Sequence, residues 1–125
     1  MILLTKTEVL AIHRRSLEEF GGSDGIRDEG AFEYALVSVE NRILYETADV
    51  LACAATYAYH LTMAHAFVDA NKRVGAATMR VFLLVNEVEV NASEDELYDL
   101  FIGIASGEIR RDAVEEWLKE RVSAS

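Results

Sequence analysis

Apolar side chains recur every three to four positions over most of the chain, and this spacing predicts α-helices rather than strands. The first helix is predicted to begin at Thr5, which forms a capping box with Glu8 three residues later, and to end at Gly21–Gly22. A second helix is expected to start at Asp28 and to end near Asn41. Its apolar positions are Phe32, Leu36 and Val39.

The pattern is less regular between residues 41 and 47, where residues 42–45 could adopt an extended conformation. A central helix is predicted from about Asp49 to about His65. Residues 51–68 carry no charge, and this length reaches the minimum for a membrane span. Their many alanine, threonine, tyrosine and histidine side chains give too little apolar transfer energy for insertion. We therefore interpret this segment as the buried central helix of a bundle.

Two more helices and one short alternating segment follow. A fourth helix is predicted from Asn71 to Leu84 or Val85, and a fifth begins at a second capping box, residues 93–96, and stops at Gly107. Between them, Val88–Val90 alternates like a strand but is too short to found a sheet. The last helix is expected to bury Val114, Trp117, Leu118 and Val122.

Six helices with short loops predict one all-α domain over residues 1–125, a compact bundle of about six helices. The net charge of −10 disfavours a surface for nucleic acid, because it repels phosphate backbones. Cys53 is the single cysteine and cannot form an internal disulfide, which favours a reducing compartment. Charged residues Lys6 and Glu8 follow the N-terminus too soon for a secretory signal. We expect a cytoplasmic protein that neither spans a membrane nor binds nucleic acid.

The segment that suggests chemistry is residues 65–73, His-Ala-Phe-Val-Asp-Ala-Asn-Lys-Arg. It lies within residues 50–86, where three basic side chains accompany one acid, whereas acids predominate on both sides. Lys72 and Arg73 fall in the first turn of the fourth helix, where the helix dipole disfavours cations. A bound phosphate would reverse this penalty, because unpaired N–H groups, the dipole and both cations would converge on one anion.

Two further side chains of the segment suit group transfer from a nucleotide. Histidine exchanges protons near neutrality, so His65 is a candidate general base. Asp69 offers the hard oxygen ligand that Mg²⁺ prefers, and it could also cap the fourth helix; the two roles are compatible. A base, a metal ligand and a phosphate site within nine residues predict an enzyme that transfers part of a nucleoside triphosphate to a hydroxyl.

Residues 65–73 resemble the signature of the Fic/Doc family, H-x-F-x-(D/E)-(G/A)-N-(G/K)-R, and residues 21–31 are similar to the early segment of its Doc branch, the death-on-curing toxins. The resemblance implies a helical bundle with the signature on a loop between two central helices. It also implies that residues 38–46 form a flap that holds the target peptide as an added strand. The implied roles are His65 as catalytic base, Phe67 as anchor of the loop, Asp69 as Mg²⁺ ligand, Ala70, Asn71, Lys72 and Arg73 as the site for the phosphates of ATP, and Arg73 as a second catalytic residue.

Two positions match the Doc branch rather than the Fic adenylyltransferases, namely Lys72 in place of glycine and Ala76 in place of a second arginine. The Doc branch implies a toxin that transfers the terminal phosphoryl group of Mg-ATP to a Ser/Thr hydroxyl of a protein, with translation elongation factor Tu as the implied target. The family's self-inhibitory pattern, a Ser or Thr four residues before Glu-Gly or Glu-Asn, is missing at Glu29 and Glu40. Restraint is therefore expected from a separate antitoxin protein.

Two alternatives stay open. The first is transfer of AMP to a protein hydroxyl, and the second is a catalytically silent helical binding module. Arg80 could reach phosphate or only solvent. His13 and His60 are expected to be hydrogen-bonded core or boundary residues, and Cys53, within an apolar helix, shows no sign of thiolate activation.

Overall fold

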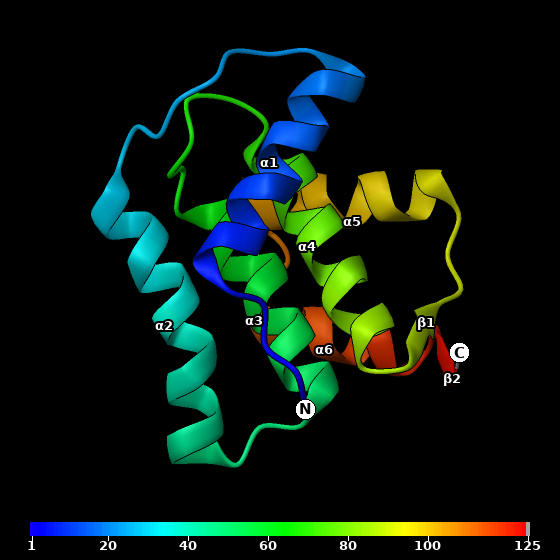
Figure 1. The fold of residues 1–125 in the computed structure, drawn as a ribbon. Helices are drawn as coiled ribbons and strands as arrows, with labels where there is room; N and C mark the ends of the chain where they lie inside the picture. The colour runs from blue at the N-terminus through cyan, green and yellow to red at the C-terminus, as the bar shows by residue number, and fades with distance from the viewer. Residues whose placement is uncertain (125) are drawn as a thin grey trace.

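The computed structural model describes residues 1–124, and its architecture is a bundle of helices with one small sheet (Figure 1). This confirms the predicted all-α class. The elements within these residues are α1 (Lys6–Phe20), α2 (Glu29–Glu46), α3 (Val50–Met63), α4 (Asn71–Val85), β1 (Val88–Val90), α5 (Glu94–Ser106), α6 (Arg111–Lys119) and β2 (Val122–Ala124).

Side-chain caps define several helix starts, as the sequence predicted. The Thr5 hydroxyl accepts a hydrogen bond from the Glu8 N–H, and the Glu8 carboxylate accepts one from the Thr5 N–H at 2.8 Å. The Asp28 carboxylate accepts from the N–H of Ala31 at 3.0 Å at the start of α2. Each cap satisfies an N–H that has no partner within its own helix.

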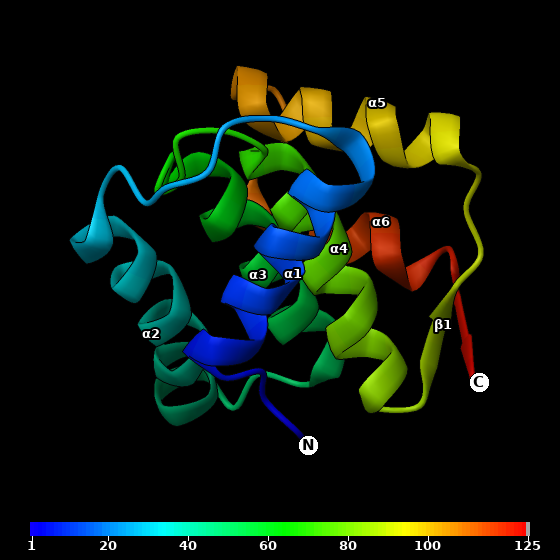
Figure 2. The ribbon, with the colours of Figure 1, turned by 45° about the horizontal axis from the view of Figure 1, so that its top comes forward.

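The apolar helix α3 occupies the centre of the bundle and contacts α2, α4, α5 and α6 (Figure 2). It ends at Met63, so His65 lies in the loop that follows rather than on the helix. Its closest partner is α4: a Cβ atom added to Gly75 would lie 2.3 Å from the Thr62 hydroxyl oxygen. None of the helices described for residues 1–124 is both long and apolar enough to cross a bilayer.

Helix α2 is longer than predicted. Residues 42–45 are helical, and the helix ends at Glu46 rather than near Asn41. The Arg42 guanidinium explains the difference, because it donates to the Ala52 carbonyl and the Thr56 hydroxyl of α3, both at 3.1 Å. Tertiary contacts with α3 therefore extend the helix. The expectation that residues 38–46 form a flap is wrong for the same reason, since they lie within α2.

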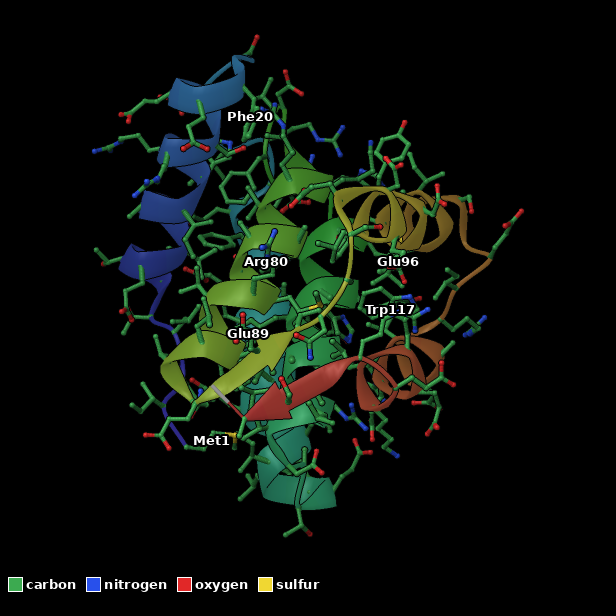
Figure 3. The ribbon with its side chains drawn as sticks, turned by 90° about the vertical axis from the view of Figure 1, so that its right-hand side faces the viewer. Met1, Phe20, Arg80, Glu89, Glu96 and Trp117 are labelled. Carbon is green, nitrogen blue, oxygen red and sulfur yellow. The ribbon has the colours of Figure 1, made fainter. Side chains whose placement is uncertain are left out.

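Val88–Val90 is a strand, as its alternation predicted, but the expectation that it is too short to found a sheet is wrong, because it pairs antiparallel with β2, with Glu89 opposite Ser123. Val122 lies in this second strand and not in the last helix, which ends at Lys119. Figure 3 shows the two strands beside α6, on which Trp117 is labelled. Trp117 is half-buried, and the Arg121 guanidinium lies 4.4 Å from its ring centre.

Candidate active site

The loop between α3 and α4 carries the signature, and the connection between α1 and α2 runs beside it (Figure 2). Ile26 and Phe67 form an antiparallel bridge. The Ala66 carbonyl accepts from the Arg27 N–H at 2.7 Å, and the Val68 N–H donates to the Gly25 carbonyl at 3.0 Å. Sequence reasoning did not foresee this pairing. Backbone hydrogen bonds thus fix the loop along residues 25–28.

The Phe67 side chain points into the core and anchors the signature loop there. Its side chain is 1% exposed and stacks on His13, with ring centres 4.0 Å apart and planes inclined by 13°. The side-chain amide of Asn71 completes this support, because its Oδ1 accepts from the Phe67 N–H and its Nδ2 donates to the Phe67 carbonyl, both at 3.0 Å. The amide of Asn71 therefore binds the loop backbone on both of its polar atoms.

Asp69 is exposed on the outer side of the same loop. Its Oδ1 accepts from the Ala70 N–H at 2.8 Å and its Oδ2 from the Ser23 N–H at 3.2 Å. These backbone bonds, and more weakly the Arg73 charge, hold the pKa of the carboxyl below its usual value. The group is ionised at neutral pH, and each oxygen retains a lone pair for a further partner.

This donor set fits a magnesium ion that is shared with a nucleotide. Within residues 1–124, no three His, Cys, Asp or Glu side chains are grouped to hold a metal by themselves. Mg²⁺ is commonly bound by one or two carboxylates, with water and substrate phosphates as its other ligands. One ionised carboxylate, that of Asp69, is therefore a suitable protein contribution.

Arg73 connects the start of α4 to the end of α1. Its guanidinium donates to the carbonyls of Ser16 at 3.2 Å and Gly21 at 3.0 Å, and lies 5.8 Å from the Phe20 ring centre. A guanidinium has five N–H donors, so donors remain for a ligand. Arg73 already has a structural role before any ligand binds.

A cleft of about 210 Å³ opens at the N-terminus of α4. It brings together His65, Asp69 and the predicted phosphate-binding residues, whereas Phe67 lies beneath it. Both His65 and Lys72 are exposed. Three lining residues were not predicted from the sequence, and they have no distinctive chemistry by which to find them. The cleft is lined by Thr62, His65, Val68, Asp69, Ala70, Asn71, Lys72, Arg73 and Ala105.

Arg80 lies outside the cleft. It forms an ion pair with Glu94 at 3.3 Å, and Figure 3 shows it midway along α4, well away from Phe20. Of the two roles that the sequence left open, the solvent-exposed one is confirmed, since the Arg80 side chain is exposed and its partner is an exposed carboxylate on α5.

The other two histidines and the cysteine do not line the cleft. His13 is buried, and its Nε2 lies 3.2 Å from the Asp69 carbonyl oxygen. The Nε2 atom of His60 is buried without a partner in the described part of the chain, which corrects the expectation that it is hydrogen-bonded. Burial raises the pKa of the Cys53 thiol to about 11, so it is not a thiolate at neutral pH.

The Fic/DOC family model matches residues 3–83, which include the whole signature loop. The chain therefore belongs to the Fic/DOC family. It is similar to the protein kinase Doc of Escherichia phage P1, with 35% identity over 117 residues. The match covers 93% of this chain and 92% of the phage protein, so the resemblance extends beyond the signature to both ends of the bundle.

Proposed function

We propose that the chain transfers the terminal phosphoryl group of Mg-ATP to a Ser or Thr hydroxyl of a protein. The observation that carries this proposal is the cleft itself, where His65, the Asp69 carboxylate and the first turn of α4 with Lys72 meet. The similarity to a protein named as a kinase supports phosphoryl rather than AMP transfer.

His65 is assigned the proton transfer. It is exposed at the cleft, so an incoming hydroxyl can reach its imidazole. As the hydroxyl oxygen bonds to the terminal phosphorus, the bond from phosphorus to the bridging oxygen breaks and ADP leaves. The hydroxyl proton passes to His65.

The phosphates are assigned to the start of α4. The first-turn N–H groups, the Lys72 ammonium and the remaining N–H donors of Arg73 provide positive charge there. Asp69 would hold Mg²⁺, which, when bound, neutralises charge on the phosphates. Asn71 contributes mainly by shaping the loop, since its amide is bound to the Phe67 backbone.

The target peptide is assigned to residues 23–27, in place of the residues of α2 expected from the sequence. This segment bridges the signature loop through Ile26, which is itself 39% exposed. A peptide added as a strand along its outer edge would bring a hydroxyl close to His65. The proximity of the segment to the loop supports this assignment.

In the cell, we propose a cytoplasmic toxin that arrests growth by modifying a translation factor, with elongation factor Tu as the first target to test. A separate antitoxin protein would restrain it, because the sequence lacks the family's self-inhibitory pattern.

Labelled ATP tests the chemistry. The purified chain, Mg²⁺ and cell extract are incubated with ATP labelled on either the γ- or the α-phosphate, and labelled protein is identified by mass spectrometry. We expect label from the γ-position only, its loss in His65→Ala, and normal labelling in Arg80→Ala, whose side chain lies outside the cleft. Label from the α-position would establish AMP transfer instead.

A growth assay tests the biological role. Expression of the parent chain should arrest growth, and His65→Ala should not. Equal inhibition by both would indicate a silent binding module. Co-expression of a small protein encoded next to this chain should restore growth if that protein is the antitoxin.

A further inference from the structure

We infer that His13, on α1, is a positioning residue that keeps the peptide between Asp69 and Ala70 in the orientation that the phosphate site needs. The inference rests on the proposed function for its kinetic consequence. Its structural part stands on the geometry of the loop alone.

The contact joins two parts of the chain that lie far apart in sequence. His13 is 4% exposed, and its Nε2 lies 3.2 Å from the Asp69 carbonyl oxygen. A carbonyl oxygen accepts hydrogen bonds and cannot donate, so Nε2 must carry the proton. The stacking of the ring on Phe67 fixes its orientation.

This contact determines where the next N–H points. In a trans peptide, the C=O and the following N–H point in opposite directions. Because the Asp69 carbonyl points inward to His13, the Ala70 N–H points outward, where it donates to Asp69 Oδ1 beside the cleft. Ala70 is one of the four residues that the family resemblance assigns to the phosphates of ATP.

The orientation is strained and needs a restraint. Ala70 has φ of 70°, in the left-handed region that a side chain with a Cβ disfavours. Rotation of the peptide plane between Asp69 and Ala70 would move this φ out of that region and turn the N–H away from the cleft. Within residues 1–124, the Asp69 carbonyl accepts no hydrogen bond other than the one from His13.

Three variants separate this role from general stability. His13→Phe keeps a ring to stack on Phe67 but removes the donor, whereas His13→Gln restores an N–H at a similar reach. Thr56→Val is the control outside the cleft, because it removes two hydrogen bonds of a buried hydroxyl, the one donated to the Ala52 carbonyl at 2.7 Å and the one accepted from Arg42 at 3.1 Å. We expect His13→Phe to lower kcat about tenfold, His13→Gln to recover most of the loss, and Thr56→Val to leave kcat unchanged.

Ala70→Gly provides the decisive test, since glycine adopts a positive φ without strain. Whatever the effect of Ala70→Gly alone, the further loss caused by adding His13→Phe to this variant should fall to less than about threefold. An equal loss in the parent and in the Ala70→Gly variant would overturn the inference, as would unchanged kcat in His13→Phe.

Nuclear magnetic resonance of the unmodified chain gives a readout that requires neither activity nor a stable variant. The ¹⁵N shifts of His13 should show the proton on Nε2, and a proton on Nδ1 with Nε2 bare would overturn the inference. If the parent chain transfers no phosphoryl group, the proposed function fails, but the His13 tautomer still decides the structural claim.

Discussion

The N-termini of α4 and α5 differ in how their unpaired N–H groups are satisfied. At α5, the Ser93 hydroxyl accepts from the Glu96 N–H at 3.0 Å, the Glu96 carboxylate accepts from the Ser93 N–H at 3.1 Å, and three acids occupy the first turn. At α4, the preceding residue is Ala70, which has no capping side chain, and the first turn contains Lys72 and Arg73 but no acid.

The difference agrees with the proposal that a phosphate binds at the α4 end and not at the α5 end. Acids in the first turn of α5 complement the helix dipole, whereas the cations of α4 oppose it at a cost of a few tenths to about 1 kcal/mol each. Arg73 gains hydrogen bonds to the Ser16 and Gly21 carbonyls in return, whereas Lys72 has no hydrogen bond or ion pair within residues 1–124. An anion at this end reverses the sign of the interaction, so stability and binding should respond oppositely to the same substitution.

The largest expected effect is on nucleotide binding. Lys72→Glu removes a cation from the proposed phosphate site and introduces a repelling charge, and should weaken Mg-ATP binding about 1,000-fold, or about 4 kcal/mol. Isothermal titration calorimetry measures the change. The matched control is Asp95→Lys, a charge reversal at the equivalent position of α5, for which affinity should not change. A gain of affinity in Asp95→Lys as large as the loss in Lys72→Glu would mean that net charge, not position, governs binding.

Protonation of His60, in α3, should lower the stability of the chain at acid pH. This effect must be subtracted before the stabilities of variants at the two helix ends are compared at acid pH. Burial, with the nearby charges of Arg111 and Arg42, lowers the pKa of His60 from 6.5 to about 4. The unfolded chain therefore binds the proton more readily between these values. Stability should be complete above about pH 6.5 and fall by up to about 3 kcal/mol as the pH decreases to 4. Urea titrations of the parent and His60→Gln should show this slope in the parent alone.

Removal of the α5 cap should cost stability without affecting binding. Ser93→Ala leaves the Glu96 N–H without its partner and should lower the free energy of unfolding by about 1 kcal/mol. Mg-ATP affinity should stay that of the parent. Urea denaturation and calorimetry on the same sample measure both quantities, and a change in affinity would contradict the separation of the two ends.

The smallest expected effect is on the stability of the ligand-free chain, and it has the opposite sign at the two ends. Lys72→Glu should stabilise by about 0.5 kcal/mol and Asp95→Lys should destabilise by a similar amount, because the helix dipole favours acids at an N-terminus. Both changes should shrink in high salt. Destabilisation by Lys72→Glu would show that the lysine already has a favourable partner in the free protein.

Local signals explain what could be predicted from the sequence. The capping boxes at Thr5 and Ser93 and the signature residues 65–73 are contiguous, so their geometry follows from neighbours along the chain. The end of α2 could not be predicted, because Arg42 is held by groups of α3 whose position in space a linear pattern does not contain. The strand Val122–Ala124 depends on β1 in the same way.

The same distinction between local signals and distant contacts applies to the candidate site. Its nine signature residues are recognisable, but the groups that hold them are backbone atoms of distant segments, such as the Ser16 and Gly21 carbonyls bound by Arg73. Every residue has a carbonyl, so no residue type marks these positions. His13 fits an apolar helix face equally well as a packing residue, and its bond to Asp69 depends on how α1 docks.

The close approach of α3 and α4 at Gly75 has a consequence for genetic screens. Position 75 lies outside the cleft lining, yet even one methyl group there would meet the Thr62 hydroxyl at 2.3 Å. The added group would push α4 away from α3 and so displace the first turn of α4, which carries Asn71 and Lys72. If expression arrests growth as proposed, substitutions of Gly75 should therefore be recovered among the survivors alongside those of His65, and they would mark as essential a residue that lies outside the cleft.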